Sequence, residues 1–109
     1  MFVCSLGCRV RPDKEREFLV SIERLMERTR RLTGCCACRA NTALGDRSSV
    51  TLVTEWTDRA SLDRYFVSDE YHILRGMHIL LVGEQPLMVD EVVARAKLPP
   101  DWTSEGPVI

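Results

Sequence analysis

The stretch from Val50 to Val82 constrains the fold most, because it carries the pattern of a strand followed directly by two helices. Up to Trp56 the residues alternate between two faces, with the period of two that a half-buried strand requires. One predicted face consists of Val50, Leu52, Thr54 and Trp56. Asp58 is a suitable N-cap, because its carboxylate can accept from free backbone N–H groups, so we expect a helix to begin after it.

The second helix of this stretch is predicted to start at Ser68 and Asp69. Its apolar stripe consists of Ile73, Leu74, Met77, Leu80 and Leu81. Gly83 is the expected end of the helix. This helical phase leaves Tyr71 and His78 on one margin of the stripe.

The remaining elements follow from the same periodicities. Residues 2–10 alternate as a first strand, and Pro12 ends that strand and begins a helix. The helix has one predicted apolar stripe, made of Phe18, Leu19, Ile22, Leu25, Met26 and Thr29. Gly34 stops the helix, and residues 35–44 then form a strand that turns back into the next one. Residues 87–95 are the expected last strand.

The predicted element order is therefore βαββαβ, in an α+β fold. With right-handed crossovers, two such βαβ halves give a ferredoxin-like antiparallel sheet of order 4-1-3-2, with both helices on one face. The other face is left bare although it carries apolar residues such as Val3, so we expect a face-to-face homodimer, a dimeric α+β barrel. Residues 1–96 are the predicted domain, and residues 97–109, with their prolines, are a predicted extended C-terminal arm.

Composition excludes several other classes of protein. The chain has 109 residues, of which 45% are hydrophobic and 28% charged, as in one globular domain. With 15 basic and 16 acidic residues, its net charge of -1 gives no field that would attract nucleic acid. The apolar runs are far shorter than the roughly 20 residues needed to cross a bilayer, and the start lacks the basic residues of a signal peptide. We predict a cytoplasmic protein with neither a nucleic-acid nor a membrane partner.

Five cysteines raise the question of a disulfide or a metal site. On a regular strand Cys35 and Cys38 would lie about 10 Å apart and point to opposite faces, and Cys4 and Cys8 would lie about 13 Å apart. Neither pair then suits a disulfide or a shared metal ion. We predict buried structural thiols and no metal site, with an exposed reactive thiol among Cys35, Cys36 and Cys38 as the alternative.

The central stretch contains a series of short motifs. In chain order they are Glu55-Trp56-Thr57-Asp58, Leu62, Ser68-Asp69-Glu70-Tyr71 and, after an apolar helix, Pro86. This series resembles the antibiotic biosynthesis monooxygenase (ABM) family of small dimeric α+β barrels, over residues 2 to 96. The resemblance implies the fold given above and a monooxygenase that is cofactor-free or linked to haem, and it implies little about the substrate.

Oxidation of an electron-rich phenol or quinol by O₂ without a cofactor requires a dry pocket, a base that makes the substrate anionic and a donor that stabilises the developing oxyanion. Trp56 ends a strand, where its ring can wall a pocket and its indole N–H can donate. Tyr71, Arg75 and His78 recur along one side of the second helix as an acid–base and anion-holding set. We predict these four as catalytic residues, in a cavity between sheet and helices. The alternative is plain packing for Trp56 and His78.

Three further residues are predicted substrate contacts: Asn41, Glu70 and His72. The role of Asn41 depends on the hairpin register, because a loop longer or shorter by one residue decides whether Asn41 or Cys38 shares a face with Trp56. Many quinol-type members of the family carry a histidine just before the aromatic residue of the second helix, where this chain has Glu70. That carboxylate is a candidate base, although the helix dipole explains it equally well.

The haem-degrading branch of the family pairs a first-strand asparagine with a tryptophan at the end of the third strand and a haem-ligating histidine in the second helix. Trp56 matches the tryptophan, but residues 5–7 lack the asparagine and Arg75 occupies the histidine position. The resemblance therefore disfavours haem cleavage and leaves haem as an alternative cofactor only.

Three functions remain as hypotheses. The first is a monooxygenase that needs no cofactor and uses O₂ on a small aromatic, quinol-like or polyketide-type metabolite. The second is a non-enzymatic small-molecule-binding or stress-related dimer. The third is a haem-binding or haem-degrading ABM protein.

Overall fold

The computed structural model of the chain describes residues 1–83 and 86–96. The strands are β1 (Phe2–Arg9), β2 (Cys35–Ala43), β3 (Asp46–Trp56) and β4 (Leu87–Glu91). The helices are α1 (Glu15–Arg30), α2 (Arg59–Phe66) and α3 (Asp69–Gly76), and the short 3₁₀ helices are η1 (Pro12–Lys14) and η2 (Met77–Leu80). This order contains the predicted βαββαβ pattern, with the second helical region divided into pieces.

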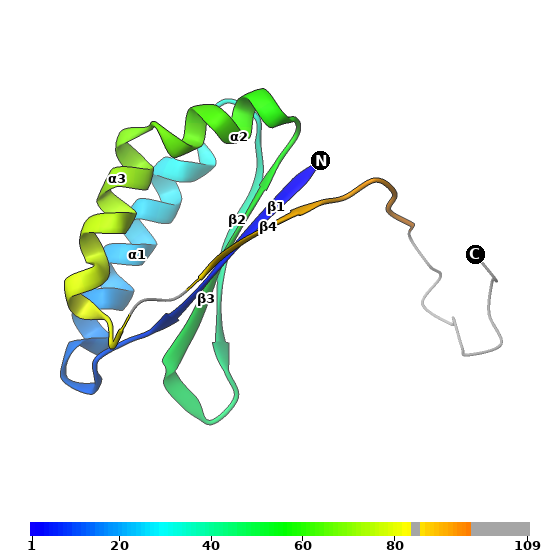
Figure 1. The fold of residues 1–109 in the computed structure, drawn as a ribbon. Helices are drawn as coiled ribbons and strands as arrows, with labels where there is room; N and C mark the ends of the chain where they lie inside the picture. The colour runs from blue at the N-terminus through cyan, green and yellow to red at the C-terminus, as the bar shows by residue number, and fades with distance from the viewer. Residues whose placement is uncertain (84–85, 97–109) are drawn as a thin grey trace, which may run out of the picture.

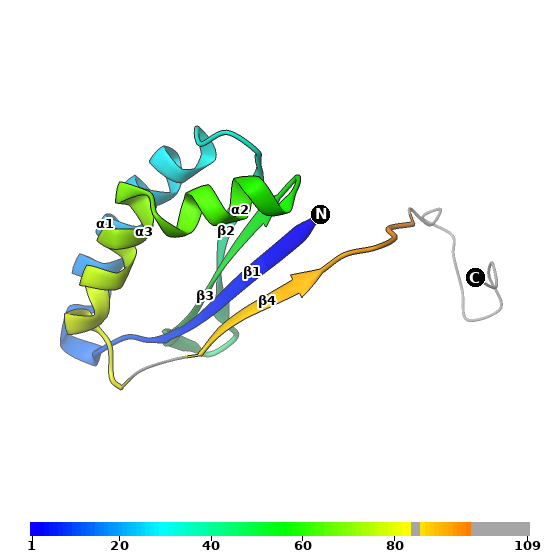
Figure 2. The same cartoon turned by 45° about the horizontal axis from the view of Figure 1, so that its top comes forward.

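The four strands form one antiparallel sheet in the order β2-β3-β1-β4, which confirms the predicted order 4-1-3-2. Figure 1 shows the three α-helices gathered on one face of this sheet. In Figure 2, α2 and α3 follow one another at an angle, and α3 packs on α1. We call the other face, on which no helix of the described residues lies, the open face. Its side chains include Val3, Ser5, Thr51, Val53, Glu55 and Met88.

The hydrophobic core lies between the helices and the helix-facing side of the sheet. The strands contribute the predicted alternating residues, which are Cys4, Leu6, Cys8, Val50, Leu52 and Trp56. The helices contribute Phe18, Ile22, Leu25, Leu62, Leu74 and Met77. Leu19 and Ile73, which were predicted in the apolar stripes, are instead 42% and 41% exposed, because the buried arc of each helix is narrower than the periodicity indicated.

The second helical region is not one long helix that runs to Gly83. The side chain of Asp58 caps α2 and that of Ser68 caps α3, by accepting from the backbone N–H groups of Ser61 and Tyr71. The α-helix then ends at Gly76 and continues only as η2. The predicted caps are confirmed, and the predicted end of the helix was wrong.

The last strand, β4, is also shorter than the predicted strand of residues 87–95, because its pairing partner β1 begins at Phe2. β4 pairs with β1, and its last residue, Glu91, lies opposite Phe2 at the start of that strand. Beyond Glu91, the backbone N–H of Val92 donates to the carbonyl oxygen of Met1 at 2.7 Å, and the amino terminus of Met1 donates to the carbonyl oxygen of Val92 at 3.5 Å.

The hairpin register, which the sequence left open, places Cys38 opposite Thr54 on the helix side and Asn41 opposite Thr51 on the open face. The ladder shifts between Cys35 and Ala37, which is a β-bulge. The expectation that Cys35 and Cys38 point to opposite faces was wrong, since both contact the core on the helix side. The extra residue of the bulge reverses the alternation that a regular strand would have.

None of the described helices is long and apolar enough to cross a membrane. The predicted C-terminal arm, residues 97–109, lies outside the described residues.

Gly34 joins the end of the α1–β2 connection to the start of α2. It has a φ of +82°, and its carbonyl oxygen accepts from the backbone N–H of Thr57 at 2.9 Å. A Cβ at this position would lie 2.0 Å from the Oγ of Ser61. The glycine is therefore required both by its backbone conformation and by the close approach of α2.

We expect Gly34→Ala to lower the free energy of unfolding by about 3 kcal/mol or more, because it adds a steric clash to the strain of a positive φ. Gly45→Ala is the matched control, since Gly45 has a φ of +80° and no atom within 4 Å of the added Cβ. It should cost only about 1–2 kcal/mol, the cost of the left-handed conformation. Urea unfolding measures both values, and equal losses would contradict the packing argument.

Glu55 is a buried carboxylate on the open face, held between two arginines. Its Oε1 accepts from Arg95 at 2.7 Å and its Oε2 accepts from Arg39 at 2.6 Å, and the residue is 7% exposed. The hydrogen bonds from Arg95 and then from Arg39 lower the pKa of this carboxyl below its ordinary value of 4.5. The cluster ties β2 and the segment after β4 to β3.

A lowered folded-state pKa means that the ionised Glu55 stabilises the fold above pH 4.5 and that this contribution is lost as the pH falls through the lowered pKa. Glu55→Gln should therefore be less stable than the wild type near neutral pH, and the difference should shrink as the pH is lowered below 4.5. Arg95→Gln should reduce the same pH dependence. Urea unfolding at a series of pH values measures this, and a pH-independent difference would contradict it.

Candidate functional site

Four aromatic rings cluster where β3 meets α2 and α3. Trp56 and Tyr65 stack with their centroids 4.6 Å apart, and Tyr71 stands edge-on to Tyr65 at 5.3 Å and to Phe66 at 5.1 Å. Trp56 is 0% exposed, and its indole N–H donates to the Oγ1 of Thr54 at 2.9 Å. Trp56 is thus fixed as an aromatic wall whose only polar hydrogen already has an acceptor.

A cavity of about 140 Å³ opens beside this wall, between the end of α1 and α2. Its lining residues are Leu32, Thr33, Trp56, Ser61, Arg64, Tyr65 and Ser68. We call it the Trp56 cavity. Arg64 donates to the Oγ of Ser61 at 3.1 Å. The Oγ of Ser68 donates to the carbonyl oxygen of Tyr65 at 2.6 Å, so both hydroxyl groups are positioned by α2.

The electrostatics of the Trp56 cavity favour an anion. Arg64 carries a guanidinium at its rim, and no aspartate, glutamate or histidine is among the described residues that line it. Burial raises the pKa of Tyr65 above its usual range, so its phenol stays neutral. The nearby carboxylate of Asp58 has a lowered pKa because it accepts from the backbone N–H of Ser61, and it is committed to capping α2. The cavity can therefore hold a small aromatic anion, and it supplies no general base.

The structure brings only some of the predicted site residues to this cavity. Trp56 lines it, and Tyr71 contacts its aromatic wall through Tyr65. Arg75 is exposed, and His78 is exposed on η2, where its Nδ1 lies 3.0 Å from the carbonyl oxygen of Arg75. Neither Arg75 in α3 nor His78 in η2 is among the residues that line the Trp56 cavity.

The predicted substrate contacts also lie apart from one another. Glu70 accepts from Arg28 at 3.2 Å and so joins α3 to α1. His72 is exposed, with its Nδ1 2.7 Å from the carbonyl oxygen of Ser68. Asn41 is exposed on the open face, opposite Thr51. Their roles as substrate contacts stay predictions that the geometry of this cavity does not support.

Arg64 is the charged residue that the sequence interpretation missed. A signal was present, because Ser61, Arg64 and Ser68 follow one another at spacings of three and four, which places them on one side of a helical stretch. The sequence analysis instead placed most of the predicted catalytic residues on the helix that begins after Ser68. The two serines and the arginine all line the Trp56 cavity.

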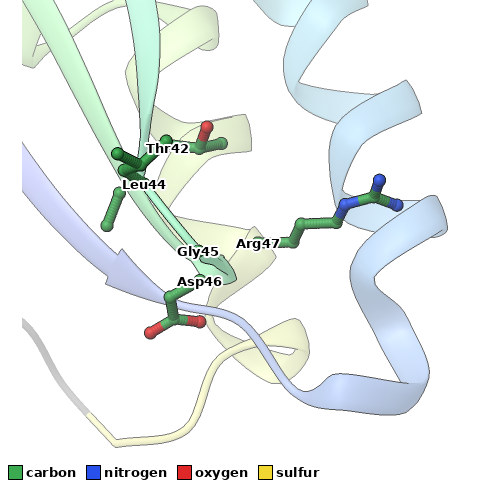
Figure 3. Close-up of a pocket in the computed structure, with 6 residues that line it drawn as sticks. Thr42, Leu44, Gly45, Asp46 and Arg47 are labelled. Carbon is green, nitrogen blue, oxygen red and sulfur yellow. The ribbon is translucent and has the colours of Figure 1, made fainter.

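A second hollow, of about 500 Å³, lies at the turn between β2 and β3 and is lined by residues 42–47. Figure 3 shows the side chains of Asp46 and Arg47 pointing in different directions there. Asp46 accepts from Arg9 at 3.3 Å, and Leu44 is fully exposed. Polar groups that diverge in this way do not form a binding site for a small molecule.

The five cysteines are free thiols. Burial raises the pKa of Cys4, Cys8 and Cys38 to about 11, so these three remain protonated and packed in the core. Within residues 1–83 and 86–96, no group of three or more His, Cys, Asp and Glu side chains is placed to hold a metal ion.

Comparison with known families and structures agrees with the fold. A family model for antibiotic biosynthesis monooxygenases matches residues 1–74, and the chain belongs to that family. A comparison with curated proteins finds no match.

Solved structures of the same fold match most of the chain. An antibiotic biosynthesis monooxygenase superposes with a TM-score of 0.78 at 19% identity, covering 86% of this chain and 100% of its own. A conserved protein from Methanosarcina mazei Go1 gives a TM-score of 0.76 at 26% identity, with 82% and 89% covered. The protein Rv0793 from Mycobacterium tuberculosis gives 0.78 at 18% identity, with 88% and 98% covered. These similarities show that the chain has the fold of the ABM family. They do not indicate its substrate.

Proposed function

We propose that this protein is a monooxygenase that needs no cofactor and uses O₂ to oxidise a small aromatic or quinol-like metabolite bound in the Trp56 cavity. The observation that carries the proposal is the pairing, in an ABM chain, of a stacked Trp56–Tyr65 wall with the guanidinium of Arg64 at the same cavity. An aromatic wall receives the ring of a substrate, and a guanidinium favours its anionic oxygen.

The size of the cavity limits the substrate. A cavity of about 150 Å³ is sufficient for benzene, and the Trp56 cavity measures about 140 Å³. We therefore favour a single-ring phenol or quinol over a larger polyketide-type metabolite. A larger substrate would need Arg64, which is exposed at the rim, to swing away.

The proposed chemistry places the deprotonation of the substrate outside the protein. Since the described lining residues include no carboxylate or imidazole, the phenol loses its proton to water, and Arg64 binds the resulting anion. The anion is the electron-rich form that reacts with O₂. The buried aromatic wall keeps water from that face of the ring. The rate should then rise with pH through the pKa of the substrate.

The proposal predicts that Arg64→Gln lowers O₂ consumption at sub-saturating substrate by about tenfold or more, the scale of losing a placed charge-assisted donor. An oxygen electrode and a panel of quinols and anthrones measure this. Arg24→Gln is the matched control, because Arg24 is an exposed arginine of α1 that does not line the cavity. It should leave the rate unchanged.

The same assay decides between this cavity and the helix margin expected from the sequence. If Arg75→Gln or His78→Ala lowers the rate by about tenfold while Arg64→Gln does not, the site lies at that margin. The assignment of the site to the Trp56 cavity would then be wrong.

A second candidate function is binding of a small aromatic anion without oxidation, as in a stress-related dimer. The absence of a general base among the described lining residues favours it. Titration calorimetry with the same quinols under nitrogen measures binding alone. Binding that depends on Arg64, together with no O₂ consumption in air, would select this function over the first.

Haem binding in the Trp56 cavity is disfavoured because neither His72 nor His78 is among the residues that line it. A shift of the Soret band on addition of haem, lost in His78→Ala, would reverse this conclusion.

We also propose that the protein is a homodimer in which the open face is covered. Val3 and Met88 lie on that face, and Met88 is 56% exposed. The free cysteines suit a reducing compartment, so a cytoplasmic location is part of the proposal. The balanced charge continues to predict no nucleic-acid partner.

Met88→Asp should convert the dimer to a monomer at micromolar concentration, because it places a charge in the buried apolar contact. Leu19→Asp is the control, since Leu19 is an exposed apolar residue of α1 on the other side of the molecule. Light scattering measures the molar mass. A monomeric wild type, or a Met88→Asp variant that remains a dimer, would contradict the proposed interface.

A further inference from the structure

The β-bulge in β2 falls within a short segment that carries three thiols, those of Cys35, Cys36 and Cys38. Cys35 lies opposite Trp56, Ala37 lies opposite Glu55, and Cys36 is the additional residue between them. Cys35 and Cys38 contact the core on the helix side of the sheet. Cys36, the residue inserted at the bulge, is exposed, and its Sγ lies 3.8 Å from the carbonyl oxygen of Gly34.

These three thiols line one cavity with a cationic side chain. The cavity measures about 390 Å³, and its lining residues are Arg30, Cys35, Cys36, Ala37 and Cys38. The guanidinium of Arg30 is held in place, because its Nε and one terminal nitrogen donate to the carbonyl oxygen of Cys38 at 3.1 and 2.9 Å. A bidentate contact of this kind fixes the charge of the arginine beside the thiols.

Only one of the three thiols is open to a solute. Cys38 is buried and Cys35 is half-buried, and burial raises the pKa of both, although the charge of Arg30 acts in the opposite direction. Cys36 is exposed at the mouth of the cavity. A reagent that enters the cavity therefore meets the exposed Cys36 in a cavity that Arg30 also lines.

We infer that Cys36 is a site of reversible modification by small disulfides that carry carboxylates, with Arg30 as the group that binds the carboxylate. In the reaction the thiolate of Cys36 attacks one sulfur of the disulfide. A protein–small-molecule disulfide forms, the original S–S bond breaks, and the second half leaves as a thiolate that takes up a proton. The protein thiol is oxidised and the released half is reduced, so no other oxidant is required.

The geometry favours a mixed disulfide over an internal one. Adjacent Cα atoms, as in Cys35 and Cys36, are about 3.8 Å apart, which is below the range that a disulfide accepts. Cys36 and Cys38 lie two residues apart along a strand, so their Cα atoms are separated by about 6–7 Å, at the upper end of the range that a disulfide accepts. A small external disulfide has neither restriction.

The site does not depend on the proposed oxygenase activity. It is distinct from the Trp56 cavity, with which it shares no lining residue.

The first test is incubation of the full chain with oxidised glutathione, followed by intact-mass measurement and peptide mapping. We expect one glutathione adduct, on Cys36, that dithiothreitol removes. Cys36→Ser should abolish the adduct, and Cys8→Ser should retain it. An adduct on another cysteine, an adduct that survives Cys36→Ser, or no adduct would overturn the assignment.

The second test isolates the role of Arg30 by comparing two disulfide probes that differ in charge. The anionic probe is 5,5′-dithiobis(2-nitrobenzoate) and the neutral one is 4,4′-dithiodipyridine, and the ratio of their rate constants at Cys36 is measured. Arg30→Gln should lower this ratio by about two- to fivefold, the effect of one partly exposed charge. Arg30→Lys should restore most of it, and Arg24→Gln should leave it unchanged. An equal ratio in wild type and Arg30→Gln would overturn the role of Arg30.

Discussion

The contact between Gly34 and Ser61 is the constraint on which the functional end of the molecule depends. Because Gly34 has no side chain, α2 approaches the start of β2 closely, and the Thr57 N–H closes the junction by donating to the Gly34 carbonyl oxygen. The junction sets where α2 leaves the sheet. Tyr65 consequently lies over Trp56, and Ser61 and Arg64 reach the cavity beside it.

Electrostatics divide the molecule into two different surfaces. The Trp56 cavity and the cavity lined by Arg30 and Cys36 each contain an arginine and no carboxylate among their described lining residues, so each favours an anion. On the open face the buried carboxylate of Glu55 is satisfied by two arginines from other segments. A partner on that face would meet an ion cluster whose acid is already paired, together with apolar side chains such as Met88.

The sequence was sufficient for the architecture because the elements obey simple periodicities. The alternation that ends at Trp56 and the caps at Asp58 and Ser68 are local signals, and each appears in the structure as expected. The site was harder to predict because it depends on a bulge, on the strand register and on tertiary packing, and local sequence patterns do not indicate these features. A one-residue bulge between Cys35 and Ala37 moved Cys35 to the helix side, and the hairpin register moved Asn41 to the open face. Arg64 acquires its significance only from the packing of α2 on Trp56.

The bulge in β2 has a further consequence for the behaviour of the protein in a crowded solution. β2 forms one edge of the sheet, and an unprotected edge is a template on which strands of other molecules can add without limit. A bulge interrupts the regular spacing of N–H and C=O groups and twists the strand away from such pairing. The irregularity that places Cys36 at the surface therefore also protects this edge of the sheet against aggregation.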